Sequence, residues 1–487
     1  MPQCLCGVWG IFLLSHCLSD YIPTQGGHGM LELLKTVIQN CNGYGEVRYH
    51  HRIHTAIEAR NSTLTKVEHR TLSGAGVRVL VDGCWGFVST NDVSETGLKR
   101  ALSEAETAAK TGAALRKTKV NLAPAAQAQG EFIYYEQSEE PDIATKIQTV
   151  LDAEEMIRKS SALVTGSITM YTQYEDEKFI VNSHGASTHI LDNKPSFHVI
   201  ATVARDDQLE TGLKSVGVTG SWRDLLKQSD LNTLAKEAVE LAIKKLDAGY
   251  AKGGQYTVIL DPALVGVLAH EAIGHTVEAD FVLSGSVVQG KIEQQVASKL
   301  VTMVDDGTVN GAVGMVLVDD EGVLGQKTTI IESGILKAYL HSRESASIFQ
   351  AEPRGNARAF TYLDEPLIRM TNTFVLPGED NLDDMIEGIK DGFLLKDLGQ
   401  GGQADSTAEF MFGVAEAYRI TNGKLGEMVK GVTISGQAFD VLKSVDAVSA
   451  DFLMEMGAGH CGKFQLAKVD SGGPYLRCKV TVGGHHD

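Results

Sequence analysis

Alternation between apolar and polar residues predicts long strands in the first half of the chain. Residues 45–58 and 77–90 alternate in this way, and Asp82-Gly83 breaks the second stretch as a hairpin turn would. Hairpins of the same kind are expected over about residues 167–205. Apolar residues at helical spacing predict helices between and around these strands. These helices are expected near residues 31–40, 94–110, 142–158 and 231–247.

The second half of the chain begins with a strand that leads into a helix. Apolar residues 256–260 form the strand, Asp261 is well placed to cap the helix, and Pro262 suits its first turn. Shorter strand-like segments follow, such as residues 315–318 and 328–331. Because strands dominate this half and no internal repeat is visible, we expect a β-rich domain rather than a solenoid.

Together these patterns predict an α+β protein of two domains. The turn-rich residues 252–254 follow the last helix of the first half, so we place the boundary there. The prediction is an α/β-layered N-terminal domain, residues 30–250, and a β-rich C-terminal domain, residues 251–487, that carries the helix after Asp261. A chain of 487 residues with 43% hydrophobic residues is long enough for two such cores.

Charge and composition exclude several partners. The formal net charge of −18 argues against duplex nucleic acid, which needs a basic footprint on the protein. No run reaches the roughly 20 apolar residues of a membrane span, so we expect no membrane association. Seven cysteines without framework spacing suit a reducing compartment, and a cytoplasmic location is therefore predicted.

The first 29 residues differ from the rest of the chain. Cysteines flank an apolar stretch there, but no Lys or Arg precedes Lys35, so the basic region of a secretory signal is missing. A helix-like pattern begins only at Met30. We interpret residues 1–29 as an upstream extension, disordered or produced by a mistaken start, with a signal peptide as the alternative.

The segment His270-Glu271-Ala272-Ile273-Gly274-His275 contains the parts of a hydrolytic metal site, two imidazoles around a carboxylate. Its histidines are five residues apart, whereas histidines that share a zinc ion on a regular helix are four apart. At about 100° per residue, five residues separate two side chains by roughly 140°. A π-bulge would bring them together, and Gly274 would ease it. The alternative is two structural histidines that merely flank Glu271.

A catalytic zinc ion takes three protein ligands, so a third one must come from elsewhere in the chain. Cys461 is the best candidate because it lies in the glycine-lined segment 457–463, where Lys463 would favour its thiolate form. Cys478 alternates with apolar residues as on the inner face of a strand, so we assign it to the core. His460 is interpreted as a loop histidine, with an extra ligand or proton shuttle as the alternative.

Glu271 suits the role of general base. It lies four residues before His275, hence on the same face of a helix, without having to be a ligand itself. Glu278 and Asp280 follow within two turns and could orient a ligand imidazole. Solvated helix carboxylates are the simpler interpretation of these two residues.

Other polar clusters are interpreted as structural. His50 and His54 share one face of a strand with Arg52 between them, and a solvated strand face is expected. Residues 399–402 lack the Lys and Ser or Thr of a phosphate loop, so they predict a flexible loop. Two acidic segments predict turns, with a second cation site as the alternative: residues 305–307 and 319–322.

Several short segments resemble the TldD/PmbA family of metallopeptidases, in the family's order, over about residues 31–487. The metal-binding TldD branch of that family carries His-Glu, three residues and His, followed by a late Cys, and this chain has the same pattern. The other similar segments are residues 76–79, 86–91, 181–185, 355–359, 369–373, 461–463 and 481–484.

The resemblance implies a metal-dependent protease that acts on unfolded or extended peptides. It maps the ligands of a divalent metal ion, with Zn²⁺ expected, onto His270, His275 and Cys461, and the catalytic base onto Glu271. The PmbA branch is similar in fold but lacks these residues, so the chain resembles the active branch. The expected partner is a PmbA/TldE-like paralogue in a heterodimer, or a second copy in a homodimer.

Hydrolysis of peptide bonds through a metal-activated water is therefore the predicted function. A non-catalytic regulatory or peptide-holding partner with a structural metal is the first alternative. A structural ion would be expected to fill all four coordination positions with protein ligands, whereas only three strong candidates are visible here. A metal hydrolase of non-peptide amides is the second alternative, because it would use the same catalytic parts.

Overall fold

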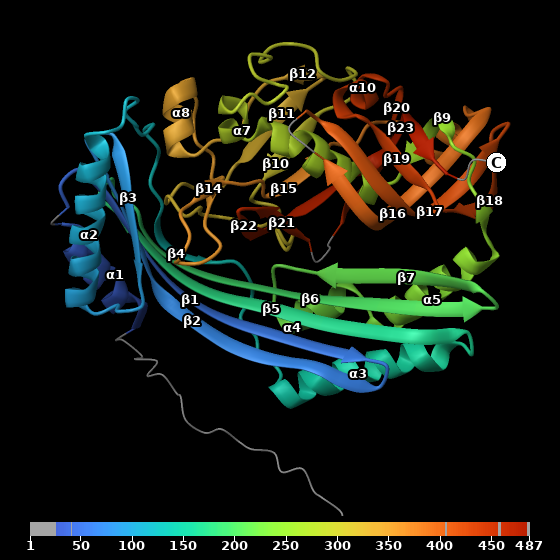
Figure 1. Cartoon of the computed structure of the whole chain (residues 1–487), viewed down its shortest axis with the longest axis horizontal. Helices are drawn as coiled ribbons and strands as arrows, with labels where there is room; N and C mark the ends of the chain where they lie inside the picture. Colours follow the sequence, from blue (N-terminus) through green and yellow to red (C-terminus); the bar gives the residue numbers. More distant parts are fainter. Residues whose placement is uncertain (1–25, 40, 405–406, 456–458, 485–487) are drawn as a thin grey trace, which may run out of the picture.

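Two β-sheets organise the chain, as Figure 1 shows. The computed structural model describes residues 26–39, 41–404, 407–455 and 459–484. Residues 1–25, which make up most of the expected upstream extension, lie outside the described part. The first helix, α1 (Gly26–Ile38), begins earlier than predicted and includes residues 26–29; the upstream extension stays a prediction.

The N-terminal sheet has, within the described residues, seven strands in the order β3-β2-β1-β5-β6-β4, with β7 beside β6. These are β1 (Tyr44–Arg60), β2 (Thr63–Val81), β3 (Cys84–Thr90), β4 (Gln129–Ile133), β5 (Val164–Asn182), β6 (Ser187–Arg205) and β7 (Gln208–Gly217). The antiparallel pairs β2–β3 and β5–β6 confirm the predicted hairpins. Asp82 and Gly83 both have positive φ, as a tight hairpin turn requires.

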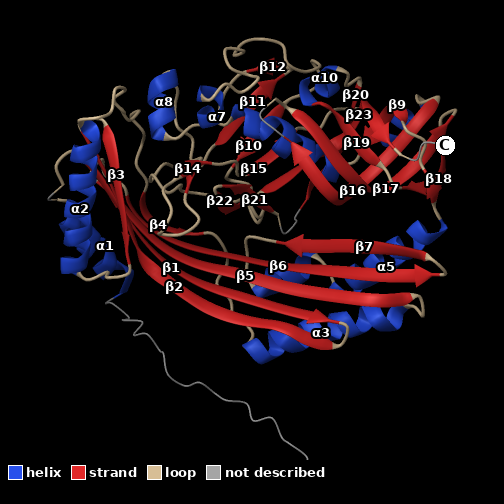
Figure 2. Ribbon diagram, in the orientation of Figure 1, coloured by secondary structure: helices blue, strands red, loops and turns tan. Residues whose placement is uncertain are grey.

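Helices cover one face of this sheet, which gives the predicted α/β layers (Figure 2). They are α2 (Glu95–Ala113), α3 (Ile143–Ser160), α4 (Trp222–Gln228) and α5 (Leu231–Asp247). Side chains alternate along β1, so Val47 packs into the helix-covered core while Arg48 points the other way and donates to the Asp364 carbonyl. The predicted helices are confirmed within a few residues at their ends.

The C-terminal sheet has twelve strands within the described residues, and the last strand, β23, lies at its centre. Its strands are β8 (Gly249–Tyr250), β9 (Gly254–Leu260), β10 (Met303–Asp306), β11 (Lys327–Glu332), β12 (Ile335–Leu336), β15 (Asn372–Val375), β16 (Asp391–Ala404), β17 (Glu409–Thr421), β18 (Lys424–Lys430), β19 (Thr433–Gln437), β20 (Ala447–Glu455) and β23 (Asp470–Gly483). This β-rich half confirms the predicted α+β fold class. The division of domains at residue 250 stays a prediction.

Smaller elements surround the C-terminal sheet. Two two-stranded sheets are formed by β13 (Ala357–Arg358) with β14 (Leu367–Ile368), and by β21 (His460–Lys463) with β22 (Gln465–Lys468). The short helices are α6 (Pro262–Val267), η1 (Leu268–Gly274), η2 (His275–Val277), α7 (Ala279–Leu283), α8 (Arg343–Phe349), α9 (Leu382–Glu387) and α10 (Ala438–Lys443). None of the described helices combines the length and apolar character that a membrane crossing demands.

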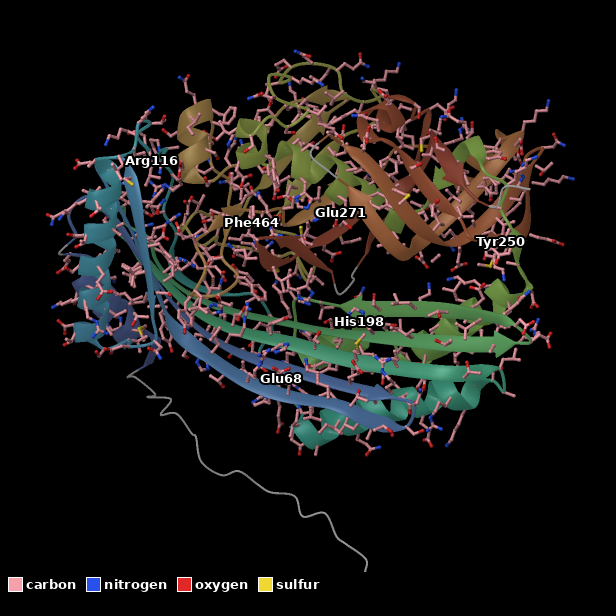
Figure 3. All side chains as sticks on the ribbon, viewed as in Figure 1. Glu68, Arg116, His198, Tyr250, Glu271 and Phe464 are labelled. Atoms are coloured by element: carbon pink, nitrogen blue, oxygen red, sulfur yellow. The ribbon has the colours of Figure 1, made fainter. Side chains whose placement is uncertain are left out.

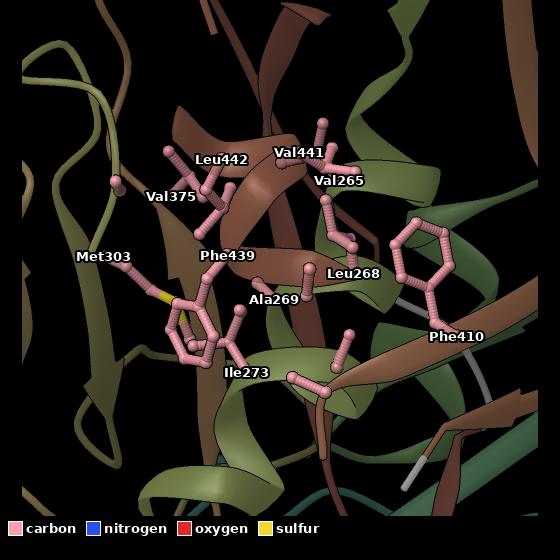
Figure 4. Close-up of a cluster of buried hydrophobic side chains, with 14 of the residues drawn as sticks. Val265, Leu268, Ala269, Ile273, Met303, Val375, Phe410, Phe439, Val441 and Leu442 are labelled. Atoms are coloured by element: carbon pink, nitrogen blue, oxygen red, sulfur yellow. The ribbon is translucent and has the colours of Figure 1, made fainter. Parts of the chain in front are cut away.

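The helix that carries the two histidines is anchored in the C-terminal core. Figure 4 shows its apolar side, with Leu268 and Ile273 among the side chains of α10, of which Phe439 and Leu442 are labelled. All four of these side chains are at least 95% buried. The imidazoles are thus held by a rigidly packed segment rather than by a loop.

Ion pairs join the N-terminal sheet to the turn at residues 319–322. Arg78 on β2 binds Glu321 at 2.9 Å, and Lys178 on β5 binds Asp320 at 3.0 Å. The segment 319–322 is the acidic turn that we predicted. It is buried, because the N-terminal sheet packs against it and supplies its counter-charges. Charged pairs of this kind fix the orientation of the two halves more than they add stability.

The same packing corrects the expected solvated face of β1. His50 and Arg52 are buried and both bind Asp176 of β5, with His50 Nε2 and Arg52 Nε at 2.9 and 2.6 Å from its Oδ1. Burial lowers the pKa of His50 to about 4 against the opposing effect of the carboxylate. The polar residues on this face of β1 therefore bind charged residues of the protein rather than water.

Three further predictions of local structure were wrong. Residues 315–318 form no strand, because they fill a small apolar cluster between the two halves and make a single bridge to Leu324. Residues 399–402 lie within β16, where the register with β17 shifts, rather than in a loop. Asp305 lies on β10, where it accepts hydrogen bonds from Thr371, Thr373 and Asn356, rather than in an acidic turn.

Gly86 allows helix α2 to approach strand β3 closely. A Cβ atom at this position would collide with the carbonyl oxygen of Ala105, which is helix backbone and cannot rotate away. The glycine therefore sets the distance between the helix layer and the sheet. At Gly249, by contrast, a Cβ atom would meet nothing within 4 Å of it.

We predict that Gly86→Ala lowers the free energy of unfolding by about 1–3 kcal/mol, because the helix must move away from the sheet. Gly249→Ala serves as the matched control and is expected to change stability by less than about 0.5 kcal/mol. Thermal unfolding followed by circular dichroism would compare the two variants with the parent protein. Equal midpoints for all three would contradict the packing argument.

Candidate metal centre

The first histidine is positioned by the junction of β9 and α6. Asp261 caps the helix, since its carboxylate accepts a hydrogen bond from the Leu264 amide at 2.9 Å, and Pro262 occupies the first turn. The helix then widens into the π-helix η1 and ends in the 3₁₀ turn η2. The expected π distortion is confirmed, and the amide of His275 donates to the carbonyl of His270, five residues earlier.

Three side chains meet at this distortion. One ligand atom each from His270, His275 and Cys461 lies within 4.8 Å of the other two. Cys461 arrives on hairpin β21–β22, and its Sγ is 3.2 Å from His275 Nε2. Bond lengths of about 2.0–2.3 Å to zinc require ligand atoms roughly 3–4 Å apart, so small side-chain movements would complete a tripod.

The environment of His270 suits a metal ligand. Its ring is buried, and neither ring nitrogen has a hydrogen-bond partner among the described residues. Burial, helped by the charges of His275, Arg369 and Arg358, holds the pKa of His270 well below its usual range. The ring is therefore neutral, which is the form that binds metal, and an unpaired imidazole in a dry site is costly unless something coordinates it.

His275 is held from the opposite side by Glu278. Its Nδ1 lies 2.9 Å from Glu278 Oε2, which leaves Nε2 directed toward Cys461. Burial disfavours the charged ring, but the hydrogen bonds and charges of Cys461 and Glu278 outweigh it and raise the pKa of His275 to about 10. A carboxylate behind a ligating imidazole fixes its tautomer and increases its basicity.

Lys463 acts on the carboxylates rather than on the thiol, contrary to our expectation. Its buried ammonium binds Glu278 at 3.1 Å, Asp280 at 2.8 Å and the Ile368 carbonyl at 3.0 Å. Glu278 is fully buried, so its interpretation as a solvated helix carboxylate is wrong. Lys463, Glu278 and His275 instead form a continuous chain of hydrogen bonds behind the candidate site.

Two residues at the site were not assigned a role from the sequence. Arg369 donates to the carbonyls of Cys461 and Gln465, both at 2.7 Å, and so fixes the hairpin that carries the cysteine. Met370 packs directly on Gly274, where a Cβ atom would collide with its sulfur. Both lie in the segment 369–373, whose resemblance to the family was the only available signal.

Glu271 stands at the open side of the cluster. Its Oε2 is 3.6 Å from His275 Nε2, and 42% of its side chain is exposed. Figure 3 shows Glu271 in the C-terminal domain above the N-terminal sheet. It is close enough to exchange a proton with a molecule at the cluster while remaining in contact with solvent.

The other two candidate ligands from the sequence, His460 and Cys478, lie outside the group of three side chains. His460 begins β21 rather than lying in a loop; it is exposed, and its ring contacts that of Tyr174 with 5.7 Å between the centroids. Cys478 is buried in β23, as predicted for a core residue. Neither belongs to the group of ligand atoms found among the described residues.

Sequence profiles of three domains match most of the chain. They are described as PmbA/TldA metallopeptidase domain 1, central domain and C-terminal domain, and they match residues 45–109, 136–246 and 253–484. The chain belongs to the TldD/PmbA family. The candidate metal-binding residues His270, His275 and Cys461 all lie within the part matched by the C-terminal domain of that family.

Relatives extend this likeness over nearly the whole chain. A protein named metalloprotease from Methanothermobacter thermautotrophicus is 34% identical over 447 residues, which are 91% of this chain and 95% of that protein. A metalloprotease TldD homolog from Buchnera aphidicola is 31% identical and covers 91% of this chain and 92% of its own length. The solved structure of TldE from Thermococcus kodakarensis shares the fold, with a TM-score of 0.72 and 16% identity over 93% of this chain and 100% of TldE.

We predict that Cys461→Ser loses most of the metal that the parent protein binds, because a neutral hydroxyl replaces a thiolate ligand. Cys478→Ser is the matched control and is expected to keep its metal content, provided that circular dichroism shows it folded. Metal analysis of both purified variants by mass spectrometry would provide the measurement. Equal metal content in the two variants would place the third ligand elsewhere.

Proposed function

We propose that this protein is a metallopeptidase that hydrolyses peptide bonds with a divalent ion, Zn²⁺ by preference, held by His270, His275 and Cys461. The observation that carries the proposal is the buried, unpartnered imidazole of His270 beside the ligand atoms of the other two residues. Names of relatives as metalloproteases support it. A set of two imidazoles and one thiolate is typical of zinc sites.

Glu271 is proposed as the base and acid of the reaction. When bound, the divalent ion would polarise the scissile carbonyl and lower the pKa of a water molecule, so that this water could lose a proton and attack at neutral pH. Glu271 accepts the proton that this water releases as its oxygen bonds to the carbonyl carbon. It then delivers the proton to the amine nitrogen as the carbon–nitrogen bond breaks, so that the carboxylate is regenerated.

His275 and its neighbours are proposed to hold the site in shape. Glu278 and Lys463 keep the ring of His275 in one orientation, with Nε2 toward the ion. Arg369 holds the hairpin that brings Cys461 into reach. Rigid support of this kind matters because small displacements of reacting groups slow catalysis strongly.

The number of ligands favours a catalytic rather than a structural ion. Only three ligand side chains gather within the described residues, which leaves one tetrahedral position for water or substrate. The half-exposed Glu271 lies beside these ligand side chains, 3.6 Å from His275 Nε2. A peptide-holding partner with a structural metal would need no such base, whereas hydrolysis of a non-peptide amide would use the same parts.

An extended peptide is the proposed substrate. Hairpin β21–β22, which carries Cys461, pairs with no third strand among the described residues. A peptide that binds as an added strand uses its own backbone groups, which a folded protein has already paired. From family resemblance we further propose a PmbA/TldE-like paralogue as the partner in a heterodimer, with a homodimer as the alternative.

We predict that Glu271→Gln keeps the metal but lowers peptide hydrolysis by at least about 10²–10⁴-fold, because the amide fills the same space without accepting a proton. Metal content and peptide turnover, measured on the same preparation, would separate binding from catalysis. Near-normal turnover by the metal-loaded variant would rule out Glu271 as the base.

We also predict strong selectivity for unfolded substrate. We would compare a stably folded small protein with a destabilised variant that is unfolded under the same conditions. The unfolded variant should be cleaved at least about tenfold faster in initial rate. Mass spectrometry of the fragments would follow both reactions. Equal rates would refute the extended-peptide proposal, and full activity of this chain in the absence of any paralogue would refute the heterodimer.

A further inference from the structure

A basic cavity lies between the N-terminal sheet and the C-terminal domain, next to hairpin β21–β22. Its empty volume is about 650 Å³, including the part that opens to solvent. Strands β1, β5 and β6 form one wall, and C-terminal segments that include β22 form the other. Five cationic side chains line the cavity: Arg52, Lys178, Lys194, Arg358 and Lys468.

Three carboxylates in the lining neutralise only some of these cations. Asp176 binds Arg52 at 2.6 Å, Asp320 binds Lys178 at 3.0 Å, and Asp192 binds Lys194 at 3.2 Å. With five basic and three acidic side chains, the basic groups outnumber the acidic ones by two in the lining. The two cations without an ion pair among the described residues are Arg358 and Lys468.

The ammonium group of Lys468 is the unusual one of this pair. Lys468 is 4% exposed, and its Nζ makes no hydrogen bond to any described residue. Its Nζ lies 5.4 Å from the centre of the Tyr174 ring. Burial, with the charges of Lys194 and Arg52, lowers the pKa of Lys468 to about 7. An anion in the cavity would favour the charged form and supply the missing partner.

This cavity is next to the candidate metal centre, on the hairpin that carries Cys461. Ala467, which lines the cavity, is paired with Cys461 across the hairpin, where partner residues lie about 5 Å apart. Arg358 donates to the carbonyl of Lys468, and its charge also contributes to the low pKa of His270. An extended chain anchored in the cavity would reach the metal side chains within a few residues, at about 3.3 Å per residue.

We propose that the cavity binds a carboxylate group of the peptide substrate and so determines which peptide bond is hydrolysed. This inference rests on the proposed peptidase function and adds a substrate preference to it. The carboxylate can come from the C-terminus of the peptide or from an aspartate or glutamate side chain. Arg358 supplies planar donors and Lys468 a point charge, a combination suited to carboxylate oxygens.

Binding of short fluorescent peptides to the full-length Glu271→Gln protein tests the proposal without turnover. Three peptides of one sequence are compared: a free acid, its C-terminal amide, and an amide with one internal glutamate. Fluorescence anisotropy is expected to show at least about tenfold tighter binding of the free acid than of the plain amide. Tight binding of the glutamate peptide as well would identify the carboxylate, rather than the chain end, as the recognised group.

Charge variants in the same background connect this preference to the cavity. Lys468→Met should abolish the difference between acid and amide, whereas Lys468→Arg should keep most of it. Lys479→Met removes a cation from the exposed face of β23 and should leave the difference unchanged. A preference that survives Lys468→Met, or equal binding of acid and amide to the parent, would overturn the proposal.

Turnover by the protein with Glu271 intact separates this inference from the proposed function. If no peptide is hydrolysed at all, the peptidase proposal itself fails. If acid and amide peptides are hydrolysed and bound alike, the peptidase proposal stands and the carboxylate site fails. Displacement of the bound free-acid peptide by inorganic phosphate and by a small carboxylate would also be compared. Equal displacement by both at the same concentration would indicate a general anion pocket and would overturn the proposed recognition of a substrate carboxylate.

Discussion

The candidate site depends on one backbone feature, the π-helical segment η1. Five residues separate His270 from His275, and a regular α-helix would direct their rings to different sides. The wider turn brings both rings to the same side, with centroids 5.4 Å apart. The preceding helix α6 is capped by Asp261, and the π-helical segment is packed at its end by the contact between Gly274 and Met370. π-Turns are rare, and they persist where the surrounding packing compensates for their poorer geometry.

Much of the fold could be predicted because local pattern and tertiary packing agree there. The hairpin at Asp82-Gly83 and the capped helix at Asp261 have turn and cap chemistry that acts within a few residues. Prediction failed where burial comes from distant partners. The apolar residues 315–318 do not form a strand but pack in a cluster between the two halves. The polar residue His50 is buried because its partner is Asp176 rather than solvent.

The candidate site divides in the same way. His270, Glu271, His275 and Cys461 could be chosen from residue type and spacing, because metal chemistry restricts which side chains are suitable. The groups that orient them could not be found so easily. Lys463 was assigned to the cysteine because the two are close in sequence, yet its ammonium binds Glu278, 185 residues away. Support of this kind is visible only after the chain has folded.

Buried charged residues also lie at the contact between the N-terminal sheet and the C-terminal half, close to the candidate site. The carboxylates of Asp320 and Glu321 form ion pairs with Lys178 and Arg78 of the N-terminal sheet. These pairs fix the position of the sheet relative to the C-terminal half. Paired charges of this type are insensitive to ligands because each already has a partner. Lys468 has no ion-pair or hydrogen-bond partner among the described residues, and the anion that we propose for the cavity would supply one. The same interface therefore combines ion pairs that fix the two halves together with a buried ammonium group beside the candidate metal-binding residues.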